Sequence, residues 1–235
     1  MSTKRKTRTG PTQVVVERPI VAVWCGSAPP VRSIRWLDGV LATAEKFGSA
    51  VAIVAGEPSW LDLAADRASR VNVATTAVET DLKLDYLGWA QIVAAMMRKL
   101  AVSTLLVDEA SRRERFAEVA AIAELLDAVQ LTHVVAIAHD GPVVHASRVN
   151  GRELQTVRVR GPAVFGVRIA GPPIEEFPTP MPTSSMRRFD LASLGLDPLV
   201  LGHRALPPQR TNPQPKKSID RIADHLSVHL VPRGS

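Results

Sequence analysis

Short apolar runs alternate with amphipathic segments through the first half of the chain, and this alternation constrains the fold most. The runs occupy residues 20–24, 50–55, 71–74 and 104–107, and the amphipathic segments occupy residues 33–47, 59–68, 86–100 and 114–126. Continuous apolar runs are typical of strands that are buried on both faces. Strands that alternate with helices of about 10–15 residues predict a doubly wound parallel sheet. We therefore expect an α/β fold.

Two of the expected helices carry start signals. Ser59, followed by Asp62 three residues later, resembles a capping box. Asp85 can accept a hydrogen bond from the first turn of the helix at 86–100. Both signals place helix N-termini after strands, as the alternation requires.

The pattern changes after residue 130. Residues 132–138, 143–149 and 154–160 predict three strands, separated by Asp140-Gly141 and Asn150-Gly151. Both dipeptides are strong signals for two-residue hairpin turns. We expect an antiparallel β-meander attached to the parallel sheet, and a buried strand at 163–169 after it.

Prolines crowd the C-terminal third. Eleven of the 18 prolines lie between Pro162 and Pro215. Proline lacks a backbone donor and disrupts helices and central strands, so residues 171–188 predict an extended arm that reaches a partner. A helical turn near Leu191, a strand near Val200 and a last helix at 218–226 are expected to follow.

These patterns divide the chain into four parts. We expect a disordered basic tail at 1–18, an α/β body with its meander at 19–170, and a partner-binding arm with a C-terminal helix at 171–229. Residues 230–235 read as an expression-tag remnant.

Charge and composition exclude several classes of protein. The net charge is +6, but residues 10–229 hold 24 Lys and Arg against 23 Asp and Glu, a net charge of +1, so no nucleic-acid partner is expected. The single cysteine excludes a disulfide within the chain and favours a cytoplasmic location. No apolar run approaches the roughly 18 residues of a transmembrane helix.

Ligands of open α/β sheets bind at the carboxyl ends of the strands. The candidate cofactor-binding residues are therefore Trp24, Cys25 and Gly26 after the first strand, and Ala55 and Gly56 after the second. The alternative is that both segments are simple strand-to-helix turns. Cys25 has no basic neighbour in the sequence, which favours a packed side chain over a reactive thiol.

Other polar residues give weaker signals. Arg112 and Arg113 open an expected helix, where they contact either an anion or only solvent. His133, His139 and His145 are evenly spaced, but no cluster of Asp, Glu or Cys accompanies them, so we expect no metal site. No nucleophile, base and acid can be assembled, and we expect no catalytic residues. A binding or carrier subunit fits best.

Four segments of the chain resemble the beta subunits of electron transfer flavoproteins. VNGRELQTV at 149–157, followed by Pro-Ala-Val at 162–164, is similar to a meander segment of that family. MPTSSMRR at 181–188 resembles its recognition loop, and PPQRT at 207–211 resembles its closing motif. AADRA at 64–68 is similar to a turn that follows the second strand in the family.

The resemblance implies a function. Such a subunit pairs with an alpha subunit that holds most of the FAD, receives electrons from a flavin-dependent dehydrogenase and passes them to a quinone reductase. It implies that Met181 anchors the dehydrogenase, with Pro182 and Met186 in the same docking arm. Methionine suits this role because it adapts to irregular apolar pockets.

The chain also departs from the family. Family members bind AMP through Asn, Gln and Thr after the fourth strand, where this chain has SRRERFAEV at 111–119. Arg112, Arg113 and Arg115 can still meet an anion, but the sequence favours a subunit without AMP. The alternative function is a free-standing nucleotide-binding regulator of the universal-stress type. An enzyme that uses Cys25 is a more distant alternative.

Overall fold

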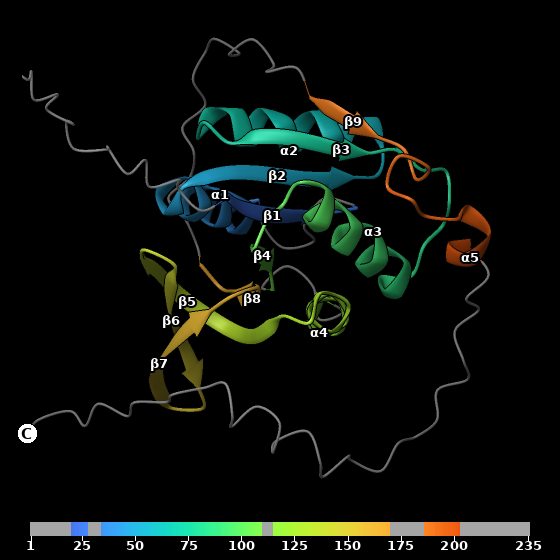
Figure 1. The fold of residues 1–235 in the computed structure, drawn as a ribbon. Coiled ribbons are helices and arrows are strands. Elements are labelled where there is room, and N and C mark those ends of the chain that lie inside the picture. Colours follow the sequence, from blue (N-terminus) through green and yellow to red (C-terminus); the bar gives the residue numbers. More distant parts are fainter. Residues whose placement is uncertain (1–19, 28–33, 110–114, 170–185, 203–235) are drawn as a thin grey trace, which may run out of the picture.

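The computed structural model describes residues 20–27, 34–109, 115–169 and 186–202 (Figure 1). The strands are β1 (Ile20–Gly26), β2 (Ser49–Ala55), β3 (Ala74–Val78), β4 (Thr104–Asp108), β5 (Val129–Asp140), β6 (Val143–Asn150), β7 (Glu153–Arg160), β8 (Ala163–Val167) and β9 (Arg187–Phe189). The helices are α1 (Arg35–Phe47), α2 (Pro58–Arg70), α3 (Tyr86–Lys99), α4 (Arg115–Leu126) and α5 (Pro198–Gly202).

All described strands belong to one sheet, ordered β7-β6-β5-β8-β4-β1-β2-β3-β9. Pairing is parallel from β5 to β9 and antiparallel where β6 joins β5 and β7. Gly141 and Gly151 turn the two hairpins with positive φ angles of 54° and 63°, which glycine adopts without strain. The predicted parallel sheet and its antiparallel meander are both confirmed.

Helices cover both faces of the parallel part of the sheet. Val21, Val23 and Cys25 of β1 pack in the core on the side of α1 and α2, whereas Ala22 and Trp24 pack in the core beneath α3 and α4 (Figure 1). All five side chains are buried. This two-sided burial explains why the strand reads as an unbroken apolar run.

The chain order reverses at β1. β2 and β3 follow on one side of β1, and β4 lies on its other side with β8 beyond it. In the β1–β4 register, Trp24 pairs with Val107, so the carboxyl ends of the two strands are adjacent. A reversal of this kind separates the loops at the strand ends and is the usual ligand crevice of an open α/β sheet.

Three local predictions met different outcomes. Asp85 caps α3 as predicted, because its Oδ1 accepts a hydrogen bond from the Gly88 backbone N–H at 2.8 Å. The predicted capping box at Ser59 is wrong, because α2 already begins at Pro58. Proline suits the first position of a helix, where its missing N–H would have no partner within the helix. The third strand is β3 at Ala74–Val78 rather than 71–74, because α2 continues to Arg70 and the turn after it places Asn72 at φ 56°.

The C-terminal region differs from the prediction in two places. The arm predicted over 171–188 ends earlier, because Arg187 and Arg188 belong to β9, which takes the outer edge of β3. The strand predicted near Val200 is wrong, since α5 occupies that position. Asp197 directly precedes α5, and its Oδ1 accepts a hydrogen bond from the Leu199 N–H at 2.8 Å, which favours a helical turn there.

The predicted turn near Leu191 is confirmed. The Ser193 backbone N–H donates to Asp190 Oδ1 at 2.7 Å, and this bond holds the pKa of the Asp190 carboxyl below its ordinary value.

Several predicted segments lie outside the described residues. They are the basic tail, most of the arm, the helix expected at 218–226 and the expression-tag remnant at 230–235. In the described segments, none of the helices combines the length and apolarity needed to cross a membrane.

Candidate functional site

The turns that follow β1 and β2 touch each other through their backbones. A Cβ atom placed on Gly56 would lie 2.1 Å from the backbone oxygen of Ser27, and Gly56 has a φ of 111°. Gly26 also has a positive φ, of 93°. Its carbonyl oxygen accepts a hydrogen bond at 3.1 Å from the indole Nε1 of the buried Trp60 in α2. Glycine at residue 56 is therefore required for these two turns to lie side by side.

Three of the predicted cofactor-binding residues are core residues. The side chains of Trp24, Cys25 and Ala55 are all buried. They pack against the helices that cover the sheet. In this conformation they can offer a ligand only backbone groups, as Gly26 and Gly56 do. Cofactor binding by these five residues stays a prediction.

Trp24 connects the end of β1 to the helix that follows β4. Its indole Nε1 donates to Oε1 of Glu118, a buried residue in the first turn of α4, at 2.7 Å. The ring also lies 5.9 Å from that of Trp89 in α3. A buried carboxylate needs donors of this kind, because an unpaired one would lose its hydration without compensation. Trp24 therefore helps to fix α4 beside the chain reversal.

A second polar cluster, which sequence reasoning missed, surrounds Glu109 immediately after β4. Its side chain is completely buried. Oε2 accepts a hydrogen bond from the His133 backbone N–H at 2.7 Å, and Oε1 lies 3.2 Å from Nε of Arg168 and 3.5 Å from Nε2 of His133. A Cβ atom on Gly166 would come within 2.5 Å of Oε2, so a glycine in β8 makes room for the carboxylate.

His133 and Arg168 share an aromatic neighbour. The Phe116 ring of α4 lies 5.3 Å from the His133 ring, and the Arg168 guanidinium carbon lies 5.7 Å from the Phe116 centroid. His133 has a φ of 59°, which is unusual for a residue other than glycine. It interrupts the β5–β8 register between Leu131 and Val134. The bulge aims the His133 N–H at Glu109, and no sequence signal marks it.

The three histidines of the meander region do not converge. His133 contacts Glu109, His139 packs its ring 4.9 Å from Phe47 of α1, and His145 lies opposite Arg158 on the β6–β7 ladder. Within the described ranges, no group of three or more His, Cys, Asp or Glu side chains is placed to hold a metal ion.

A cavity of about 480 Å³ lies between α1 and β5. Its lining comprises Thr43, Lys46 and Phe47 of α1, residues 135–139 of β5, and Ile169. The cavity is separate from both glycine turns, so it does not extend the predicted ligand crevice.

The predicted docking residues divide between described and undescribed parts of the chain. Met186 is half-buried and packs against the core on the side of α1 and α2. Met181 and Pro182 lie outside the described residues, as do Arg112, Arg113 and the 207–211 motif. Docking through Met181, Pro182 and Met186 stays a prediction.

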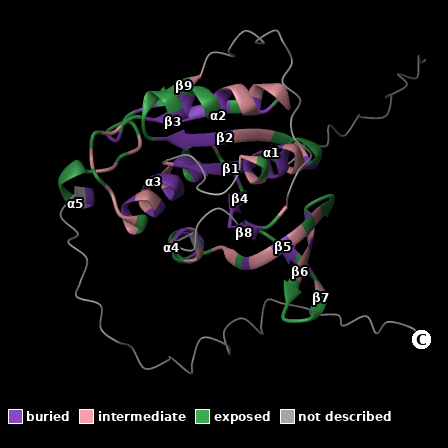
Figure 2. Cartoon of the chain, turned by 180° about the vertical axis from the view of Figure 1, so that it is seen from behind, coloured by how far each residue is buried: buried purple, intermediate pink, exposed green. Residues whose placement is uncertain are grey.

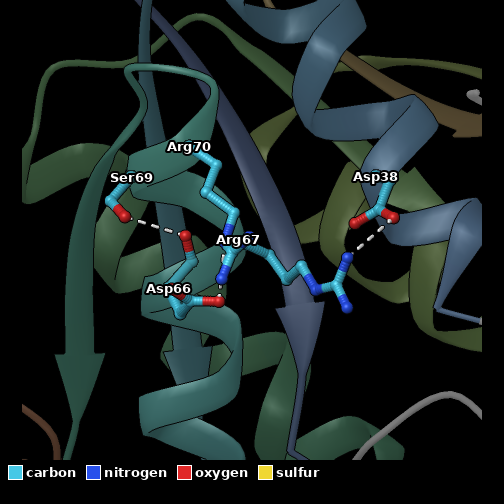
Figure 3. Close-up of polar contacts among 5 residues, drawn as sticks. All are labelled: Asp38, Asp66, Arg67, Ser69 and Arg70. Atoms are coloured by element: carbon cyan, nitrogen blue, oxygen red, sulfur yellow. Dashed lines mark hydrogen bonds and ion pairs between the residues drawn. The ribbon is translucent and has the colours of Figure 1, made fainter. Parts of the chain in front are cut away.

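The AADRA motif lies inside α2, within the helix predicted at 59–68. Arg67 reaches from α2 to the buried Asp38 of α1, with Nη1 3.4 Å from Oδ2, while Arg70 pairs with Asp66 within α2 at 2.9 Å (Figure 3). The first pair links two helices and the second lies on one helix. Both contacts serve packing on this face of the sheet.

The chain matches the model of a known family. A family model described as the electron transfer flavoprotein domain matches residues 39–185. The matched range begins within α1 and includes every described strand from β2 to β8. None of the curated proteins compared with the chain matches it.

Proposed function

The chain belongs to the electron transfer flavoprotein domain family, and from this premise we propose that it is the beta-type subunit of a heterodimeric electron transfer flavoprotein. The family is one of electron carriers. In this proposal the chain pairs with an alpha-type subunit that holds most of the FAD. It receives electrons from a flavin-dependent dehydrogenase and passes them towards a quinone reductase. We expect it to act in the cytoplasm.

The family match carries the proposal. It spans β2 to β8 and so includes the meander, which contains the 149–157 segment that resembles beta subunits. The docking arm of the proposal begins at Gly171 and includes Met181, Pro182 and Met186.

The strand ends beside the chain reversal suit a cofactor that is held mainly by another subunit. Gly26, Ser27 and Gly56 form closely packed backbone at these strand ends, and the position that a side chain at residue 56 would take is filled by the Ser27 backbone. When bound, FAD supplies the capacity to accept and release one or two electrons. The chain's own contribution is shape, backbone hydrogen-bonding groups and the choice of partner.

We propose that AMP is not bound. The Asn, Gln and Thr of AMP-binding family members are absent from 111–119, where Arg112, Arg113 and Arg115 are the residues that we predicted could meet an anion. A nucleotide-binding regulator of the universal-stress type is the competing function, and it predicts the opposite behaviour towards nucleotides.

Reconstitution tests the proposal. The chain and an alpha-type subunit from the same organism are purified separately and mixed in equal amounts, and FAD is titrated into each alone and into the mixture while flavin fluorescence is recorded. We expect tight, saturable binding in the mixture and weak binding to this chain alone. Binding of ATP by this chain alone, with no effect of the chain on FAD binding, would support the regulator instead.

A further inference from the structure

The described chain stops after β8 and resumes before β9 on the same face of the sheet. Its last residue before the gap is Ile169, and its first residue after the gap is Met186. Both side chains are half-buried, and both pack against the core on the side of α1 and α2. We call the 16 residues between them, 170–185, the connecting segment.

The strand order favours this face for the whole connection. The β1–β2 and β2–β3 connections step along the sheet towards β9, and their helices, α1 and α2, cover one face. The β3–β4 connection steps the other way, and its helix, α3, covers the opposite face. The step from β8 to β9 is again towards β9, and both strands are parallel to the rest. Because crossovers between parallel strands are right-handed almost without exception, this step is expected to pass over α1 and α2.

The route from β8 to β9 runs beside α1. The connecting segment leaves the carboxyl end of one parallel strand and reaches the amino end of another, as α1 does between β1 and β2. Five strand spacings of about 4.8 Å separate β8 from β9, and the return along a strand adds about 17 Å. The path is therefore about 40 Å, whereas 16 extended residues reach about 50 Å. Part of the segment can bind to the body on its way.

The cavity between α1 and β5 lies at the start of this route. Ile169 forms part of its lining, together with Phe47 and Ile137. Phe47 is buried, but Ile137 and Ile169 are only half-buried. Figure 2 shows the same contrast between elements: β4 and β8 are buried, whereas β5 is largely half-buried or exposed. At about 480 Å³ the cavity is within the size range of ligand pockets, so it has room for large apolar side chains.

Two polar side chains give the cavity a basic side. Lys46 is exposed in the last turn of α1, and His139 is exposed with its ring against Phe47. Within the described ranges, no carboxylate forms an ion pair with Lys46. An apolar lining beside a cation favours an occupant that combines apolar side chains with a carboxylate.

The connecting segment carries this combination at residues 174–177, which read Ile-Glu-Glu-Phe. Prolines flank these four residues, at positions 172, 173, 178 and 180. Proline-rich segments favour the polyproline II conformation, which has three residues per turn, so residues three apart point to the same side. Ile174 and Phe177 have this spacing. Ile174 follows Ile169 by five residues, a reach of about 17 Å.

We propose that residues 174–177 occupy the cavity between α1 and β5. Ile174 and Phe177 enter its apolar lining, and a carboxylate of the Glu175–Glu176 pair meets Lys46. The contact anchors the start of the docking arm on the body of this chain and leaves Met181 beyond the anchor. The anchor concerns this chain alone, and only its role in docking rests on the proposed function.

Phe177→Ala removes the largest side chain of the anchor. In equilibrium urea unfolding of the full chain, the unfolding constant should rise by at least about tenfold, because a bound phenylalanine buries a large apolar surface. Met181→Ala is the matched control, an apolar residue of the same segment beyond the anchor, and it should leave the constant unchanged. Circular dichroism verifies that each variant is folded. If Phe177→Ala does not fold, Phe177→Leu makes the same comparison.

A double-mutant cycle locates the contact. In an Ile137→Ala background, Phe177→Ala should raise the unfolding constant much less, because the two side chains share one contact. In a Leu63→Ala background its effect should stay the same, since Leu63 is an exposed apolar residue of α2 that does not line the cavity. Equal effects of Phe177→Ala in both backgrounds would place Phe177 elsewhere and overturn the inference.

A disulfide tests the side of the sheet on which the segment lies. Lys46→Cys combined with Glu176→Cys should form a disulfide on mild oxidation at least about tenfold faster than Lys99→Cys combined with Glu176→Cys. Lys99 is the matched control, because it is exposed on α3, which covers the opposite face. The native Cys25 is buried and stays in both variants. Mass spectrometry of digested protein measures the disulfide, and equal rates would contradict the anchor.

These outcomes are separate from the proposed function, because each experiment uses this chain without a partner. An unchanged unfolding constant for Phe177→Ala overturns the anchor and leaves the proposed function intact. A small apolar acid that native mass spectrometry finds on the purified chain, and that is lost in Ile137→Glu, would identify the cavity as a ligand site and also overturn the anchor.

Discussion

The indole Nε1 of Trp24 donates a hydrogen bond to Oε1 of Glu118 at 2.7 Å, and so joins the end of β1 to the first turn of α4. Both residues are buried, although Glu118 is acidic. The bond crosses the chain reversal of the sheet, where β1 and β4 are neighbours. It fixes the helix that borders the expected ligand crevice.

Trp24→Phe removes the indole N–H but keeps an aromatic ring in the core. The Glu118 carboxylate then loses a donor in a buried position, which costs about 1–3 kcal/mol. Urea unfolding should show this loss. Trp89→Phe is the control, because Trp89 packs beside Trp24 in the same core but makes no described hydrogen bond through its indole. Equal losses in the two variants would mean that the Trp24–Glu118 bond contributes no stability.

Gly56→Ala should destabilise the fold strongly. The new methyl group would meet the Ser27 backbone oxygen, and alanine would be held at a φ of 111°. Backbone strain and overpacking cost about 1–3 kcal/mol each. Gly151→Ala has a φ of 63° with open space around its Cβ position, so it shows the cost of a left-handed backbone without a clash. A thermal melt of Gly56→Ala that matches that of Gly151→Ala would contradict the close approach of the two turns.

Gly166→Ala places a methyl group against the buried carboxylate of Glu109. We expect a loss of about 1–3 kcal/mol from overpacking. In a Glu109→Ala background the new methyl group has room. There, Gly166→Ala should lower the free energy of unfolding much less than it does in the unmodified chain. A double-mutant cycle of chemical unfolding measures this coupling. Additive losses would show that the two residues do not meet.

The two ion pairs on α2 should differ in strength (Figure 3). Arg67→Ala leaves Asp38, which is 1% exposed, without its partner on α2, and removal of one member of a buried pair costs about 3–5 kcal/mol at most. Arg70→Ala breaks an i,i+4 pair worth about 0.3–0.5 kcal/mol. Chemical unfolding of both variants compares them. A larger loss for Arg70→Ala would contradict the assignment of Arg67 as the inter-helix contact.

The sequence predicts the sheet well where one local pattern decides the structure. The unbroken apolar run of β1 indicates burial on both faces, and Asn150-Gly151 indicates a tight hairpin, because few other residues adopt the required backbone angles. The strand at β3 is displaced in the prediction because α2 extends beyond its last apolar residue. β9 is too short for a periodic pattern, and its place depends on the free edge of β3.

The candidate site is less predictable. The sequence predicts that Gly26 and Gly56 follow strands, but the close approach of Gly56 to Ser27 depends on the pairing of β1 with β2. The cluster around Glu109 also needs the bulge at His133 and the glycine at residue 166. These three residues come from three different strands or their ends. No spacing in the sequence connects these residues. Only the folded sheet brings them together.

The central claim is that this chain is one half of a flavin-carrying heterodimer. Co-expression with the alpha-type subunit from the same organism, followed by analytical ultracentrifugation recorded at the flavin absorbance, tests it most directly. The account predicts one coloured species that contains one copy of each chain and FAD. A colourless assembly of this chain alone, sedimenting apart from a coloured alpha-type subunit, would contradict it.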